Sequence, residues 1–210
     1  MRHTSMTAGC LILAVVWLGP LPALAPHAFF AHMIMHMGVV AVAAPLLALG
    51  VSGGRYDPVL QTPRWFAAIP ASVVELVVVW AWHAPVLHRE ARHCVAGLVA
   101  EQGTFLLAGL WLWLSALGGK TQDGGDRTAV GIVGLLLTAM HMTLLGALFG
   151  LAPRPLYAHA DGIDGLTALE DQHLGGAVML LVGGLSYLTG GLGLTARLLR
   201  TPVIVSRGQE

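Results

Sequence analysis

Histidine and methionine residues are interleaved in one short segment near residue 30. Residues 31–37 read Ala-His-Met-Ile-Met-His-Met. In a helix, His32 and His36 project from nearly the same face, about 40° apart, so their imidazoles could bind one metal ion. Met33 and Met37 stand beside them, and thioether with imidazole is the ligand set that suits Cu(I). The segment predicts a metal site; methionines that only fill an apolar surface are the alternative.

Two carboxylates stand in otherwise apolar stretches. Glu75 is the only charged residue in 65–88, and Glu101 is the only one in 93–119. A carboxylate at the centre of a membrane helix costs roughly 2.5–3.5 kcal/mol on insertion scales, so such a residue is usually kept for a role. Both are candidates to orient a ligating histidine. A protonated carboxyl bonded to a hydroxyl or backbone carbonyl, and a proton relay, remain open alternatives.

The composition is that of a membrane protein. Of 210 residues, 56% are hydrophobic and only 10% are charged, against about 25% in a typical soluble domain. A membrane-spanning helix needs about 20 apolar residues. Six stretches have that length with at most one charge: residues 7–26, 27–54, 65–88, 93–119, 128–153 and 172–196. We therefore predict an all-α, polytopic transmembrane bundle of about six helices, which excludes soluble enzymes and disulfide scaffolds.

The first stretch has two interpretations. Residues 1–26 form either the first transmembrane helix or a signal sequence cut after Ala25. Pro26 would directly follow the cut, which favours a retained helix. Cleavage would leave five helices. In either case residues 27–200 form the bundle and residues 201–210 form a cytoplasmic tail.

Loop charges predict the orientation. Cytoplasmic loops carry an excess of lysine and arginine. With the N-terminus inside, eight basic residues lie on the cytoplasmic side: Arg2, Arg55, Arg64, Lys120, Arg127, Arg197, Arg200 and Arg207. Three lie outside: Arg89, Arg92 and Arg154. We predict both termini in the cytoplasm, or the N-terminus outside if residues 1–25 are removed.

This orientation places His3 in the cytoplasm and none of the other nine histidines toward the cytoplasmic side. His83 lies near the outer end of the third helix, and His141, flanked by Met140 and Met142, lies near the middle of the fifth. The predicted ligand set is His32, His36, His83 and His141 with Met33 and Met37. His88 and His173 are expected at or beyond the outer boundary.

The start of the last helix combines acidic residues, a histidine and glycines, in the sequence Glu-Asp-Gln-His-Leu-Gly-Gly over 170–176. Asp171 is a natural N-cap for its own helix, and Asp171 with His173 could also stand at the mouth of the metal site. Gly176, and the pair Gly146 and Gly150 in the preceding helix, predict close helix packing.

Taken together, these residues resemble the CtaG-type family of membrane proteins needed to assemble cytochrome c oxidase of the aa and caa types. Four blocks carry the resemblance, in the family's order: His-Met-x-x-His-Met at 32–37 followed by Ala-Pro-Leu-Leu-Ala-Leu-Gly at 44–50; Trp-His-Ala-Pro at 82–85; Met-His-Met-Thr-Leu-Leu-Gly at 140–146 continuing to Pro-Leu-Tyr at 155–157; and Asp-Gln-His-Leu-Gly-Gly at 171–176 with Met179.

The resemblance implies a non-enzymatic assembly factor of the bacterial inner (cytoplasmic) membrane that helps to mature the oxidase's copper centres. Implied partners are oxidase subunits and a copper donor protein on the outer side. The matching residues are His32, His36, His83, Glu101, His141, Tyr157 and Asp171. The family tends to place a Glu-His pair in the fourth helix with a histidine one turn earlier. Here those positions hold Glu101-Gln102 and Leu98, which leaves Glu101 as that helix's only candidate.

Three functional hypotheses follow. The first is a protein that binds or delivers Cu(I) to an oxidase copper centre. The second is a b-type haem protein, with His36 and His141 as an axial pair. The third is a metal-free docking scaffold for oxidase subunits. A membrane iron hydroxylase would need several cytoplasmic histidine boxes, and the balanced charge offers nothing to nucleic acid.

Overall fold

The chain folds into helices. The computed structural model describes residues 2–119, 124–157 and 165–200, and those residues contain no strand. The longer helices are α1 (Arg2–Leu18), α3 (Phe29–Met37), α4 (Ala44–Val51), α6 (Ala68–His83), α7 (Pro85–His93), α8 (Val95–Leu117), α9 (Gly124–Gly150), α10 (Ala168–Val178) and α11 (Gly184–Arg200). Shorter elements are α2 (Leu21–Leu24), η1 (Gly38–Ala43), α5 (Pro58–Gln61), η2 (Pro63–Trp65) and η4 (Met179–Gly183). The predicted tail, 201–210, lies outside the described residues.

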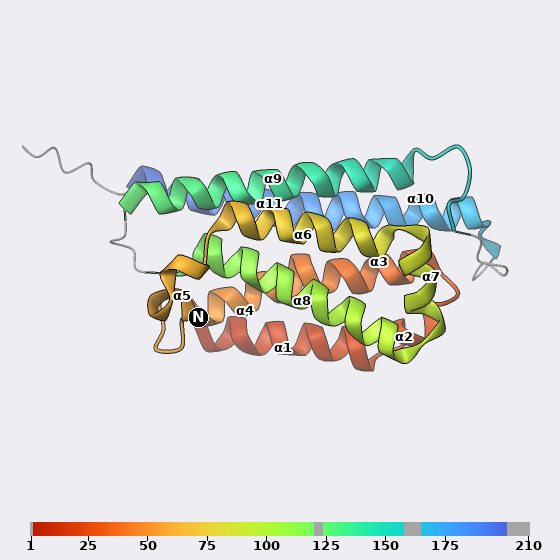
Figure 1. The fold of residues 1–210 in the computed structure, drawn as a ribbon, viewed down its shortest axis with the longest axis horizontal. Helices are drawn as coiled ribbons and strands as arrows, with labels where there is room; N and C mark the ends of the chain where they lie inside the picture. Colours follow the sequence, from red (N-terminus) through yellow and green to blue (C-terminus); the bar gives the residue numbers. More distant parts are fainter. Residues whose placement is uncertain (1, 120–123, 158–164, 201–210) are drawn as a thin grey trace, which may run out of the picture.

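Five helical segments are long and apolar enough to cross a membrane, and the bent pair α6–α7 makes a sixth. They lie side by side in an elongated bundle (Figure 1). The predicted all-α bundle of about six membrane helices is confirmed. α1 packs closely against α4, because a Cβ added to Gly9 would lie 2.8 Å from the Leu47 side chain. Retention of residues 1–26 as a membrane helix stays a prediction.

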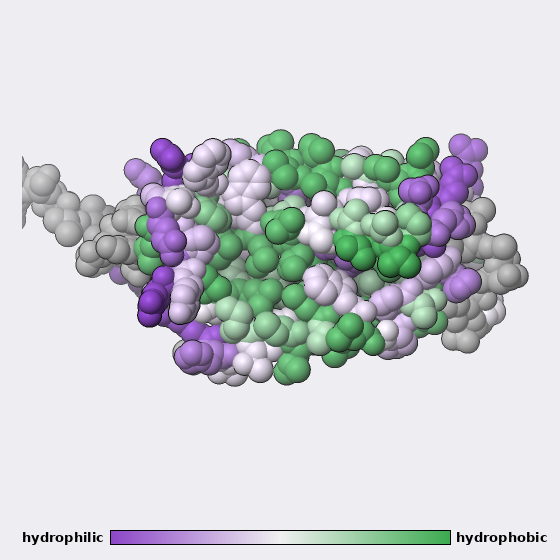
Figure 2. All heavy atoms as spheres, turned by 60° about the horizontal axis from the view of Figure 1, so that its bottom comes forward, coloured by the Kyte–Doolittle hydropathy of each residue, from purple (hydrophilic) through white to green (hydrophobic). Residues whose placement is uncertain are grey.

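The surface is apolar where a soluble protein would be polar. Figure 2 shows an apolar band around the middle of one face, with hydrophilic residues gathered at both ends. Large aliphatic side chains of the long helices are open to the surroundings; Leu107 is 69% exposed and Leu144 is 61% exposed. Because such surface is stable only against lipid tails, the band marks the membrane-embedded part of the bundle.

Glycines and a proline shape the contacts between helices. A Cβ on Gly176 would lie 2.5 Å from the Gly150 nitrogen and 2.8 Å from the Gly146 oxygen, so the predicted close approach of these helices is confirmed. Pro45 has no N–H and cannot donate to the carbonyl of Ala41, four residues earlier. The Ser186 hydroxyl donates to that carbonyl instead, at 2.5 Å. A neighbouring helix thus satisfies a backbone group that lipid could not.

The bend between α6 and α7 positions part of the site. Ala84 is extended, with φ −66° and ψ 135°, and Pro85 begins α7. A proline disfavours helical geometry in the residue before it, so α6 ends here. The two helices meet at 71°. α7 therefore turns across the end of the bundle, toward α8 (Figure 1).

Candidate metal centre

The two histidines of α3 share one face, as the spacing predicts. Both side chains are fully buried, and their rings stack with centroids 6.3 Å apart and an 8° angle between planes. The start of α3 is held in place by a side chain from α10. The Asp171 carboxylate accepts hydrogen bonds from the backbone N–H groups of Phe29, at 2.7 Å, and Phe30, at 2.9 Å.

His83, at the end of α6, presents a ring nitrogen to His32. Its Nδ1 lies 2.6 Å from the Val79 carbonyl oxygen, which can only accept, so Nδ1 carries the hydrogen. In the neutral ring Nε2 then has a free lone pair. This Nε2 lies 3.3 Å from Nε2 of His32, from which it can accept a hydrogen bond. Two nitrogens bound to one ion at about 2.0–2.1 Å with a tetrahedral angle would be about 3.3–3.4 Å apart.

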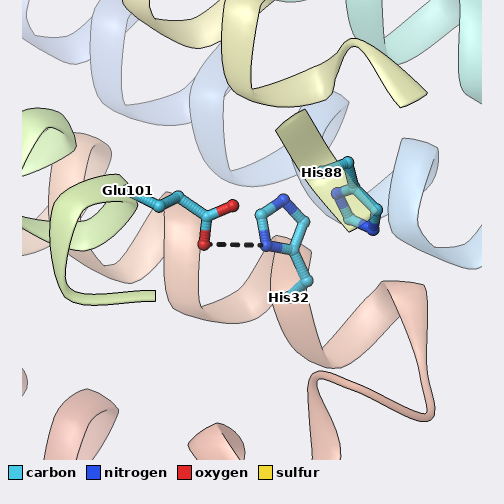
Figure 3. A group of neighbouring side chains, drawn as sticks. All are labelled: His32, His88 and Glu101. Atoms are coloured by element: carbon cyan, nitrogen blue, oxygen red, sulfur yellow. Dashed lines mark ion pairs between the residues drawn. The ribbon is translucent and has the colours of Figure 1, made fainter. Parts of the chain in front are cut away.

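A second group of ligand atoms lies on the other side of His32. His32, His88 and Glu101 each offer one ligand atom within 4.8 Å of the other two, and all three are buried (Figure 3). The His32 Nδ1 lies 3.6 Å from Oε2 of Glu101. Two imidazoles and one carboxylate form a common metal-binding set. This buried cluster could hold a metal ion.

Polar neighbours fix the position of the Glu101 carboxylate. Arg92, from α7, donates a hydrogen bond to its Oε2 and forms a buried ion pair with it. Gln102 donates to the same oxygen at 3.2 Å and accepts from the Trp17 indole at 3.2 Å. Oε1 has no hydrogen-bond partner among the described residues. Glu101 is therefore held through Oε2, and its Oε1 is available to a further partner.

Aromatic side chains enclose the cluster and exclude water. The Phe105 ring lies 4.1 Å from that of His36, and the Phe149 ring lies 5.6 Å from that of His83, measured between centroids. The Tyr157 hydroxyl donates to the His83 carbonyl at 2.5 Å. Burial, with a smaller contribution from the Glu101 charge, raises the pKa of Tyr157 well above its ordinary value. Tyr157 therefore acts as a neutral donor that anchors the end of α6.

His36 and His141 are predicted ligands on two different helices, α3 and α9. Neither ring nitrogen of His36 nor of His141 has a hydrogen-bond partner among the described residues. A positive charge on one of these rings would be felt by the other, so the two residues lie in the same part of the bundle. Buried nitrogens without partners are costly, and buried polar groups are nearly always satisfied. Four such nitrogens beside the cluster fit a site whose ligand supplies the missing partner.

Met33 and Met37, the two methionines of the predicted ligand set, contact α10 and η4. A Cβ on Gly175 would lie 3.1 Å from Cγ of Met33, and one on Gly183 would lie 3.6 Å from the sulfur of Met37. Both side chains are buried and thus pack against α10 and η4. Their role as ligands stays a prediction.

Glu75 belongs to a different polar group, nearer the middle of the bundle. Its two oxygens accept hydrogen bonds from Tyr187, at 3.2 Å, and Thr138, at 3.3 Å. Thr138 also bonds to Ser72 at 2.9 Å. The sequence left open that Glu75 is a protonated carboxyl bonded to a hydroxyl, and these hydroxyls are partners of that kind. A role next to the metal ligands stays a prediction for this residue.

The prediction that Asp171 caps its own helix is wrong. Thr167 caps α10, and Glu170 completes a capping box with it. Asp171 lies one residue further into α10, and its carboxylate instead caps α3. His173 bonds through Nε2 to the Ala152 carbonyl at 2.9 Å, which ties α10 to the end of α9.

Sequence reasoning missed His88 and Arg92, which it expected at the outer boundary and in an outer loop. Both are buried at the cluster. They are four residues apart, the same spacing that identified His32 and His36, and therefore lie on one face of α7. The Ala84–Pro85 break was the signal that this segment is a separate helix turned away from α6.

Comparison with known proteins agrees with these features. A family model described as cytochrome c oxidase caa3 assembly factor (Caa3_CtaG) matches residues 1–201. The chain therefore belongs to this family. Among curated proteins and solved structures, no match was found.

Proposed function

We propose that this member of the caa3 assembly factor family is a non-enzymatic copper-handling protein. It receives Cu(I) from a donor protein on the outer side, holds it in the buried histidine cluster, and passes it to a subunit of cytochrome c oxidase. The observation that carries the proposal is the 3.3 Å separation between Nε2 of His32 and Nε2 of His83. Copper is cargo here, and the protein catalyses no bond-making reaction.

The ion would lie between His32 and His83, with His36 as the third imidazole. The His36 ring lies 5.1 Å from that of His83, and the His32 ring lies 5.2 Å from it. Glu101, beside Nδ1 of His32, would then orient that ring from outside the ligand set. An ion between His32, His88 and Glu101 is the neighbouring arrangement. Both arrangements use His32, so an ion occupies only one of the two positions at a time.

Copper is favoured by its ligand preferences and by the family. Imidazole suits copper, zinc, iron and nickel alike, and thioether neighbours shift the preference toward Cu(I). The family resemblance adds a part in maturing the oxidase's copper centres. Few ligands and the nearby Arg92 cation both weaken the hold on the ion, which suits a protein that must release its cargo.

The test is copper binding by purified protein. We would purify the chain in detergent under reducing conditions, add Cu(I), and measure bound copper for the wild type and for His32→Ala/His36→Ala. The matched control is His27→Ala/His93→Ala, which removes two exposed histidines. We expect close to one copper per wild-type chain, the same for the control, and loss of binding in the first variant.

Three other outcomes would contradict the proposal. Absence of copper binding by the wild type would favour the metal-free docking scaffold. A Soret band in the purified protein would favour the b-type haem protein. In cells, the His32→Ala/His36→Ala variant should insert normally and yield oxidase that lacks copper; fully loaded oxidase would also contradict the proposal.

A further inference from the structure

Residues of α1, α4, α8 and α11 line a groove. It includes residues at the end of the bundle where the chain begins, and Figure 1 shows that this end lies opposite α7. Its volume is about 1100 Å³. Its walls are mainly apolar and come from α4, α8 and α11: Pro45, Leu46, Leu49, Leu117, Leu185 and Leu194. Leu49 is 47% exposed and Leu185 is 64% exposed, so the groove opens sideways onto the lipid-facing surface.

Two arginines from opposite ends of the chain line this groove. They are Arg2, in the first turn of α1, and Arg197, in the last turn of α11. Among the described residues, no aspartate or glutamate lines it. The hydroxyls of Ser52, Ser186 and Thr189 in its wall donate to backbone carbonyls. Among the described residues that line the groove, these two arginines are the charged ones.

The length of the groove matches one half of a bilayer. Along one wall it extends from Ala41 to Gly53, which corresponds to about 18 Å of helix. The hydrocarbon core is about 30 Å thick, so one leaflet accounts for about 15 Å. A lipid acyl chain in that leaflet would fill such a groove, whereas a transmembrane helix of a partner would need a groove along the whole bundle.

We propose that this groove binds an anionic phospholipid. The phosphate group lies between Arg2 and Arg197, and an acyl chain lies along the apolar wall. Basic pockets between transmembrane helices are suited to anionic headgroups, and long arginine side chains readily reach the level of those headgroups. The site is at the opposite end of the bundle from the histidine cluster and does not depend on what that cluster binds.

Native mass spectrometry in detergent tests the charge requirement. The lipids are dioleoyl-phosphatidylglycerol and the neutral dioleoyl-phosphatidylcholine. We expect a preference for the anionic lipid that falls about fivefold for each arginine replaced, the effect of one basic residue near an anionic headgroup. The variant is Arg2→Gln/Arg197→Gln. The control is Arg55→Gln/Arg64→Gln, whose arginines lie over Tyr56 and Trp65 and do not line the groove.

A second variant tests the acyl chain without changing any charge. Gly193 lines the groove, and a Cβ there would meet nothing within 4 Å. Gly193→Leu should fill the groove and weaken phosphatidylglycerol binding. Gly191 is equally open but does not line the groove, so Gly191→Leu should bind normally. Equal binding of the two lipids, or binding that neither the arginine nor the Gly193 variant changes, would overturn the proposal.

Discussion

The bundle contains two buried carboxyl groups with opposite surroundings. Glu75 accepts hydrogen bonds on both oxygens, from the neutral hydroxyls of Tyr187 and Thr138. Glu101 is held on one oxygen by Arg92 and Gln102, its other oxygen has no partner among the described residues, and imidazoles surround it. Both are completely buried, so burial alone does not distinguish them.

Glu75 and Glu101 differ in whether both carboxyl oxygens already have hydrogen-bond partners. A carboxyl whose two oxygens both accept hydrogen bonds from hydroxyls can join helices inside a membrane, and neither oxygen is left without a partner. A carboxylate with a free oxygen, beside histidines with unpartnered nitrogens, leaves open the positions that a metal ion would fill. We therefore interpret Glu75 as a link between α6, α9 and α11, and Glu101 as part of the cluster that could hold a metal ion.

The largest expected effect on stability comes from exchanging each carboxyl for an amide. Glu101→Gln leaves the Arg92 guanidinium buried without a counter-ion, which should lower the free energy of unfolding by about 3–5 kcal/mol. Glu75→Gln keeps an oxygen that accepts from one of the two hydroxyls, and its NH2 can donate to the oxygen of the other, so it should cost about 1 kcal/mol. Unfolding in mixed detergent micelles measures both values.

The double variant Arg92→Gln/Glu101→Gln is the control. It removes both charges together, so it should recover most of the stability that Glu101→Gln loses. If Glu101→Gln and Glu75→Gln lowered the free energy of unfolding equally, the Arg92–Glu101 pair would contribute no more than the hydroxyl bonds of Glu75. The contrast between the two carboxyl groups would then fail.

The second effect is on copper binding. His83→Ala removes one of the two facing Nε2 atoms and should weaken copper binding by about 100-fold, the upper end of what even supporting residues contribute at metal sites. Thr138→Ala, which alters only the group around Glu75, should leave copper binding unchanged. Titration with a competing Cu(I) chelator measures both. If His88→Ala has the larger effect instead, the ion lies between His32, His88 and Glu101.

Much of this arrangement could be predicted from local pattern. Six apolar stretches specify six spans, and the four-residue spacing places His32 and His36 on one face. The cap on α3 could not be predicted, because Asp171 is 142 residues from Phe29 in the chain and meets it only through helix packing. The positions of His88 and Arg92 depend on the bend at Pro85, whose size and direction are set by the contacts of α7 with α8.

A third prediction concerns the competition between Arg92 and the ion. The guanidinium binds the carboxylate that lies beside His32, and two positive charges a few ångströms apart repel each other. Replacing Arg92 by glutamine should therefore tighten copper binding by about tenfold, a modest part of the Coulomb energy at such distances. The same chelator titration measures the change. Weaker binding would show that Arg92 acts mainly by orienting Glu101.

The smallest effect should come from one hydroxyl of the Glu75 group. Tyr187→Phe removes the donor to Glu75 but keeps the ring, which stacks on Trp113 at 5.5 Å. Thr138 still bonds to the carboxyl, so the variant should lose only about 0.6–1 kcal/mol of unfolding free energy. Copper binding should not change.

Tyr157→Phe is the matched variant at the other group, because it removes one hydroxyl bonded to the His83 backbone. It should weaken copper binding measurably, since the end of α6 positions the ring of His83. If Tyr187→Phe affected copper binding as much as Tyr157→Phe, the two carboxyl groups would form one connected site, and Glu75 would have to be included among the residues that support the metal.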